Sequence, residues 1–207
     1  VVADDAVRSI LDRLNAAVRA AERDGALYHL RGRAHLALVR LAAEGGKPVS
    51  SRASAALMDL GSALRLDGPR TETRRRMAAA HGLIALDALE RGQDASADFE
   101  QALADLDGAG ALGAPEAELL EERAWLLFRK GEGLTIVGRD PGDALRDAIR
   151  SLDEALAREP ERHSACILRA RVRARVALGV GGSEQGAPRE FDSAWTELAA
   201  VPAGSSC

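Results

Sequence analysis

The chain has 207 residues, of which 46% are hydrophobic, 29% are charged and only 3% are aromatic, and its formal net charge is −4. A disordered chain would have fewer aliphatic residues and a larger charge imbalance. A dedicated nucleic-acid-binding domain would be strongly basic, and no apolar run approaches the roughly 18 residues that a membrane helix needs.

Helix-forming residues dominate the chain, whereas the alternation typical of strands is nearly absent. Clusters of glycine and proline separate the helical segments. In chain order, we expect one helix followed by four helical hairpins, nine helices in all: helix 3–23 and hairpins 25–68, 69–114, 115–160 and 161–203. In the second hairpin, the first helix (A) is predicted at 70–90 and the second (B) at 94–106.

An internal repeat with a period of 46 residues supports these boundaries. One column contains only leucine: Leu14, Leu60, Leu106, Leu152 and Leu198. A second contains small residues, which permit close contact between helices: Gly32, Ala78, Ala124 and Ala170. Hairpins of this kind bury their apolar stripes only by stacking. The repeat therefore predicts an all-α fold, an α-α superhelix (right-handed solenoid) of about four hairpins plus an N-terminal helix, in a single domain over 1–207.

The hairpins resemble the tetratricopeptide repeat. The B helix and its closing proline are similar in Ala148-x3-Leu152-x2-Ala155-Leu156-x3-Pro160, and Ala56-x3-Leu60-x2-Ala63-Leu64 follows the same pattern. Tyr28-x3-Gly32-x2-His35 resembles the A helix. The period departs from the family's repeat of about 34 residues and lies in the range of HEAT and armadillo units, so another helical solenoid stays open as an alternative.

The resemblance implies a concave groove that is lined by the A helices and holds a partner segment. The expected groove residues form two columns of the repeat: Arg33, Ala79, Trp125 and Arg171, and four residues earlier His29, Arg75, Glu121 and Ile167. Such a groove suits an extended or helical segment with acidic and apolar residues. Trp125 is either an anchor for this segment or a packing residue between repeats. The Lys/Asn pattern that clamps a terminal carboxylate in some family members is missing.

Histidines and cysteines are the first candidates for chemistry. His35 and His81 are one period apart and are interpreted as packing residues, because Leu127 and Arg173 continue their column and supply no further metal ligands. His163 and Cys166 could share a helical face, but we interpret Cys166 as a buried structural thiol. Cys166 and Cys207 are too few for a disulfide framework, which favours a reducing, cytoplasmic setting.

Other motifs are interpreted without catalysis. The glycine-rich run 179–186 lacks the Lys-Ser/Thr ending of a phosphate loop and is expected to be a long loop between helices. The carboxylates at 116–122 are expected at a helix start, where the helix dipole favours negative charge. Two arginine clusters, at 70–76 and 169–175, are interpreted mainly as solvated or ion-paired.

We therefore expect a non-catalytic protein–protein interaction scaffold or regulatory module, perhaps of a signalling protein, with no cofactor, metal, nucleic-acid or membrane partner. Two alternatives stay open: an enzyme-associated domain with a reactive thiol, and a helical-repeat nucleic-acid binder. Self-association is possible through the terminal helices at 3–23 and 188–200. Because the sequence begins with Val1 and not Met, we expect it to be part of a larger protein.

Overall fold

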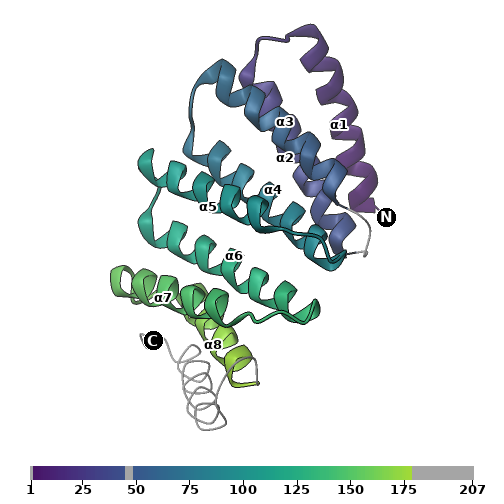
Figure 1. The fold of residues 1–207 in the computed structure, drawn as a ribbon. Coiled ribbons are helices and arrows are strands. Elements are labelled where there is room, and N and C mark those ends of the chain that lie inside the picture. Colours follow the sequence, from purple (N-terminus) through teal and green to yellow (C-terminus); the bar gives the residue numbers. More distant parts are fainter. Residues whose placement is uncertain (1, 45–48, 179–207) are drawn as a thin grey trace. The chain divides into compact units, whose positions relative to one another are not determined.

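A computed structural model describes residues 2–44 and 49–178, and over these residues the chain is all-α, as predicted (Figure 1). The described part holds eight helices and no strand. The contacts divide the chain into two compact units, residues 1–113 and 114–207. Within each unit, helices that follow one another in sequence pack together.

The first unit consists of a single helix and two hairpins. Its helices are α1 (Val2–Ala20), α2 (Gly25–Glu44), α3 (Ser50–Asp67), α4 (Thr71–Glu90) and α5 (Ser96–Ala111). In the repeat, α2 and α4 are A helices, and α3 and α5 are B helices. The A helices α2 and α4 also contact each other directly.

The described part of the second unit contains one hairpin and the A helix of the next. Its helices are α6 (Glu116–Ile136), α7 (Gly142–Arg158) and α8 (His163–Ala177). The order and the hairpin spacing agree with the sequence prediction up to α8. The last predicted B helix, the glycine-rich run 179–186, the helix expected at 188–200 and Cys207 lie outside the described residues.

The same turn closes two of the A helices, one period apart. Gly92 and Gly138 have φ angles of 70° and 71°, the left-handed conformation that glycine adopts without a steric penalty. After Gly92, the amide of Gln93 donates to the carbonyl of Ala88 at 2.9 Å, which is the hydrogen bond of a Schellman C-cap. This turn reverses the chain toward the B helix.

The B helix of the second hairpin is longer than predicted, because it runs to Ala111 and does not end at 106. The prediction treated Gly108 as a helix breaker. In the structure, the side chain of Arg74 on α4 lies where a Cβ at Gly108 would be only 3.4 Å from its Nε. Packing against α4 thus keeps this glycine within the helix, since tertiary contacts routinely override helix propensity.

The repeat columns form the core of the B helices. Leu60, Leu106 and Leu152 are at most 2% exposed. Burial of a leucine side chain stabilises a fold by roughly 1.5–3 kcal/mol. At the A helix of the first hairpin, a Cβ on Gly32 would lie 2.9 Å from Leu60 Cγ, so the small-residue column marks direct helix-to-helix contact. The superhelix and the single domain over 1–207 stay predictions.

Candidate functional site

In the first unit, the predicted groove residues lie on α2 and α4. The Nδ1 atom of His29 lies 3.0 Å from Oγ1 of the buried Thr73, and this contact joins the two A helices. Burial, together with the nearby Arg33 guanidinium, lowers the pKa of His29 below 6.5, so the ring is neutral at pH 7. Arg33 is exposed and Arg75 is half-buried. This part of the A-helix face is therefore polar and basic.

In the second unit, the predicted groove residues lie on α6 and α8. Trp125 and Ile167 are each 41% exposed, so Trp125 is not buried between repeats. Arg171 is exposed, and its guanidinium carbon lies 5.5 Å from the centre of the Phe128 ring. This cation–π contact places Arg171 of α8 against α6.

Two further apolar residues extend this A-helix face, and the sequence analysis missed both. Ile136 on α6 is 69% exposed and Leu178, directly after α8, is 65% exposed. Each follows Trp125 or Ile167 by 11 residues, which is close to three helical turns and returns to the same side of the helix. The four residues Trp125, Ile136, Ile167 and Leu178 together are called the apolar A face below.

The B helix of the same unit has a different surface. Exposed side chains of α7 are charged or are alanine: Asp143, Arg146, Arg150, Asp153, Glu154, Ala157 and Arg158. The exposed large apolar side chains of the described second unit thus lie on the A helices or at their ends, and not on α7. Exposed apolar groups that gather on one side of a protein are typical of interaction sites.

Glu121, predicted as the acid of the groove, is engaged within the second unit. Its carboxylate contacts the guanidinium of Arg162, which also binds Glu159 at 2.8 Å. Arg162 and His163 border an open depression of about 530 Å³ at the turn between α7 and α8. The acid therefore neutralises a neighbouring arginine, and the predicted site retains Arg171 as its exposed charge.

The structure brings the seven predicted residues together in two groups. His29, Arg33 and Arg75 belong to the first unit, and Glu121, Trp125, Ile167 and Arg171 belong to the second. Within each group, the residues lie on A helices that contact each other. A single groove across both groups stays a prediction.

Buried polar clusters inside the first unit are a feature that the sequence analysis did not identify. In the first hairpin, Arg31 of α2 binds Asp59 of α3 through two hydrogen bonds of 2.6 and 2.8 Å. The side chain of Asp59 is only 7% exposed. His35 Nε2 lies 3.8 Å from Asp59, and His35 Nδ1 is buried without a hydrogen-bond partner. The cluster joins A and B helices by a bidentate ion pair.

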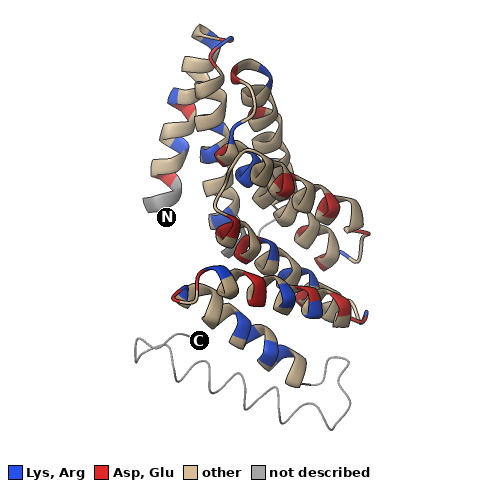
Figure 2. Ribbon diagram, turned by 90° about the vertical axis from the view of Figure 1, so that its left-hand side faces the viewer, with Lys and Arg blue, Asp and Glu red and all other residues tan. Residues whose placement is uncertain are grey.

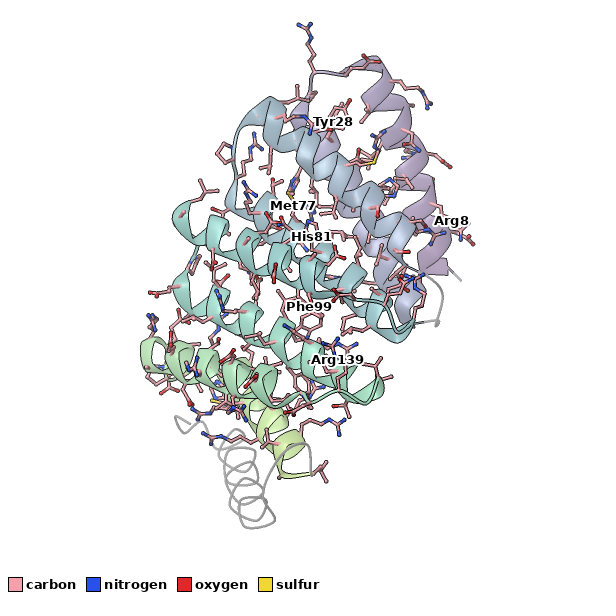
Figure 3. The ribbon with its side chains drawn as sticks, viewed as in Figure 1. Arg8, Tyr28, Met77, His81, Phe99 and Arg139 are labelled. Carbon is pink, nitrogen blue, oxygen red and sulfur yellow. The ribbon has the colours of Figure 1, made fainter. Side chains whose placement is uncertain are left out.

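The second hairpin contains a similar cluster. Arg74 of α4 binds the buried Asp105 of α5 at 2.6 Å. His81 lies between α4 and α5, with Nδ1 3.4 Å from Asp98 and Nε2 3.9 Å from Asp105 (Figure 3). The two aspartates are one period apart, and so are the two histidines.

These clusters revise the interpretation of His35 and His81. They were expected to face each other on adjacent A helices as packing residues, but each faces the aspartate of its own hairpin. Asp59 and Asp105 in one column were the available signal. In the third hairpin the equivalent positions are Leu127 and Ser151, so this hairpin holds together without the charges. The clusters therefore serve to hold hairpins together.

The stability of the chain is expected to fall when the pH is lowered below about 6.5. Burial lowers the pKa of His35 in spite of Asp59, and it also lowers that of His29. Between the lowered native pKa and 6.5, the unfolded chain binds more protons than the native chain, so the free energy of unfolding rises with pH in this window.

The urea midpoint, measured from pH 5 to pH 7.5, checks this expectation. His35→Gln should flatten the rise, and the double variant with His29→Gln should flatten it further. A pH dependence of the double variant equal to that of the unaltered chain would contradict the assignment.

The thiol alternative loses its nucleophile in this structure. Cys166 is only 1% exposed, as expected for a structural residue. The expectation of a free thiol is wrong, however, because Cys166 is disulfide-bonded. The other cysteine of the chain, Cys207, lies outside the described residues.

Several arginines of the two clusters form ion pairs. In the first cluster, Arg74 binds Asp105 and Arg76 binds Glu72 at 2.6 Å. In the second, Arg169 binds Asp153 at 2.5 Å, and Arg173 lies 3.9 Å from the same carboxylate. Figure 2 shows basic and acidic residues interspersed along the helices. These pairs reduce the positive charge on which phosphate binding depends.

Comparison with known proteins finds neither a family model nor a curated protein that matches the sequence. Within residues 2–44 and 49–178, no group of three or more His, Cys, Asp or Glu side chains is placed to hold a metal ion. None of the described helices combines the length and the apolar character that crossing a membrane requires.

Proposed function

We propose that the chain is a non-catalytic protein-interaction module, built of divergent tetratricopeptide-like hairpins, that binds a protein or peptide segment on its A helices. The observation that carries the proposal is the apolar A face of the second unit, where Trp125 and Ile167 are each 41% exposed. An exposed apolar side chain loses the stabilisation of burial, roughly 25 cal/mol per Å², until a partner covers it. The face thus offers binding energy that the fold itself does not use.

Arg171 defines the chemistry of the partner. It lies on α8 one turn from Ile167, and its contact with the Phe128 ring holds the guanidinium beside α6. Its contact is with an aromatic ring, so the guanidinium remains available to bind a carboxylate of the partner. The partner segment therefore combines a large apolar side chain with an aspartate or glutamate nearby.

The resemblance to tetratricopeptide repeats agrees with this assignment. In that family the A helices line the binding groove, and here the exposed apolar residues of the second unit belong to α6 and α8. The ion pairs of Arg74 and Arg169 favour this function over nucleic-acid binding. The burial of Cys166 favours it over thiol chemistry.

Trp125→Ala is expected to weaken binding of acidic apolar peptides at least about tenfold, because a central tryptophan supplies much of the energy of an interface. The probe is an array of 12-residue peptides in which one Trp, Phe or Leu is followed by Asp or Glu two to four residues later. Affinities of the selected peptides are then measured by fluorescence anisotropy. Arg171→Glu should shift the preference from acidic to basic peptides.

Met58→Ala is the matched control, because Met58 is an exposed apolar residue on a B helix, 72% exposed. It should leave the affinities unchanged, and thermal unfolding should show that Trp125→Ala is folded. If no peptide of the array binds, or if Trp125→Ala and Met58→Ala bind equally well, the proposed function is refuted.

A further inference from the structure

Helix α1 is a B helix by its register in the repeat, but its apolar residues are not covered in the way that those of the other B helices are. Ile10 corresponds to Ala56, Ala102 and Ala148, which are all 0% exposed, whereas Ile10 is 52% exposed. Leu14 is half-buried, although the equivalent Leu60 is 0% exposed.

The cause is the absence of an A helix that precedes α1 in the described fold. Each of α3, α5 and α7 packs against the A helix of its own hairpin. In the first hairpin, for example, Leu36 of α2 packs on Ala56 and Leu60 of α3. Among the described helices, α1 packs against α2 alone, and Figure 1 shows it at the edge of the first unit.

The repeat therefore indicates what kind of element covers this side of α1. The A–B interface recurs in three hairpins of the described chain, and it always places an amphipathic helix with a small residue, such as Gly32 or Ala78, against the B helix. Because Ile10 is larger than the alanine of the other B helices, the covering helix needs a small residue opposite it.

Arg13 adds a charge requirement. It occupies the column of Asp59 and Asp105, the buried aspartates that bind arginine and approach histidine of their own A helices. In α1 the sign of this position is reversed, and Arg13 is exposed. A helix that covers α1 in the same geometry thus carries a carboxylate where His35 and His81 stand in α2 and α4.

We propose that α1 docks an amphipathic helix of a partner protein in the place of an A helix, with a Gly or Ala opposite Ile10 and an Asp or Glu opposite Arg13. This surface is distinct from the apolar A face, which belongs to α6 and α8. The proposal does not depend on the function assigned to that face.

Synthetic peptides with the sequence of α6, residues 116–136, serve as the probe. Leu127 of this peptide stands in the column of His35 and His81, so one peptide carries Leu127→Glu and a matched one carries Leu127→Lys. Binding to the full chain is measured by fluorescence anisotropy. The Glu peptide should bind saturably and about tenfold more tightly than the Lys peptide, and Arg13→Glu should reverse this preference.

Ile10→Arg should weaken binding of the Glu peptide at least about tenfold, because it places a charge in the apolar contact. Met58→Arg, which alters another exposed apolar residue of the first unit, should leave the affinity unchanged. Absence of saturable binding, equal binding by the Ile10→Arg chain, or a preference that ignores residue 13 would each overturn the proposal. So would a dimer of the unaltered chain that Ile10→Arg dissociates in sedimentation, because a second copy would then be the occupant.

Discussion

Asp59→Ala is expected to destabilise the chain by about 3 kcal/mol, the scale found when one partner of a buried ion pair is removed. The carboxylate of Asp59 is 7% exposed and accepts two hydrogen bonds from Arg31, whose side chain is 20% exposed. Without Asp59, the guanidinium stays between α2 and α3 with no carboxylate to offset the loss of hydration. The free energy of unfolding from urea titration measures this effect.

Asp143→Ala is the matched control, since Asp143 also forms an ion pair with an arginine, Arg146, at 2.5 Å. The two side chains are 95% and 65% exposed, so this variant should change stability by no more than about 0.5 kcal/mol. Equal losses in the two variants would mean that the buried cluster has no special role.

Replacing both partners distinguishes a lost ion pair from a lost fold. The variant Asp59→Leu with Arg31→Met removes both charges and should recover most of the stability, because apolar residues can replace a buried pair at little cost. The third hairpin supports this expectation, since it has Ser151 at the aspartate position and Leu127 at the histidine position. Recovery will be incomplete, because Arg31 also contacts Asn15 at 3.3 Å and the Tyr28 ring.

Gly32→Leu is the second change with a large expected effect, a loss of about 3 kcal/mol or more. A Cβ at this position would lie 2.9 Å from Leu60 Cγ and 3.2 Å from the carbonyl oxygen of Ala56. The backbone oxygen cannot move aside without displacing α3, so a larger side chain separates α2 from α3. Urea unfolding should show the loss, and the leucine column of the core should become accessible to solvent.

Gly61→Ala tests whether the effect comes from the contact and not from the loss of a glycine. Gly61 also lies within a helix, but the nearest atom to its Cβ would be 3.6 Å away, at the end of the Arg65 side chain. Alanine should therefore stabilise α3 by about 0.5–1 kcal/mol, which is the propensity difference alone. A similar loss of stability in both variants would contradict the close approach at Gly32.

The order of the helices and the hairpin boundaries were predictable from the sequence, because apolar spacing, helix breakers and a 46-residue repeat are local or periodic signals. Leu60, Leu106 and Leu152 illustrate this, since one column predicted three buried positions. The end of α5 was not predictable in this way. Gly108 breaks helices by its intrinsic propensity, and only the Arg74 side chain packed against it shows why α5 continues.

The polar clusters show a limit of the repeat itself. The aspartates and histidines follow the period, but Arg31 and Arg74 do not occupy the same column, so the period alone does not pair them with Asp59 and Asp105. A long arginine side chain reaches an aspartate from more than one turn of the helix. Its partner is therefore decided by the packing of the hairpin.

The sequence by itself determined that this protein is a chain of helical hairpins with leucine and alanine columns as its core, because those columns are written in the spacing of apolar residues. Only the tertiary structure decided which of the remaining apolar residues face solvent. Trp125 and Ile10 stand in columns whose other members gave no indication of their exposure. Exposure depends on which neighbouring helix covers a side chain, and that is a property of the packed chain and not of its local sequence.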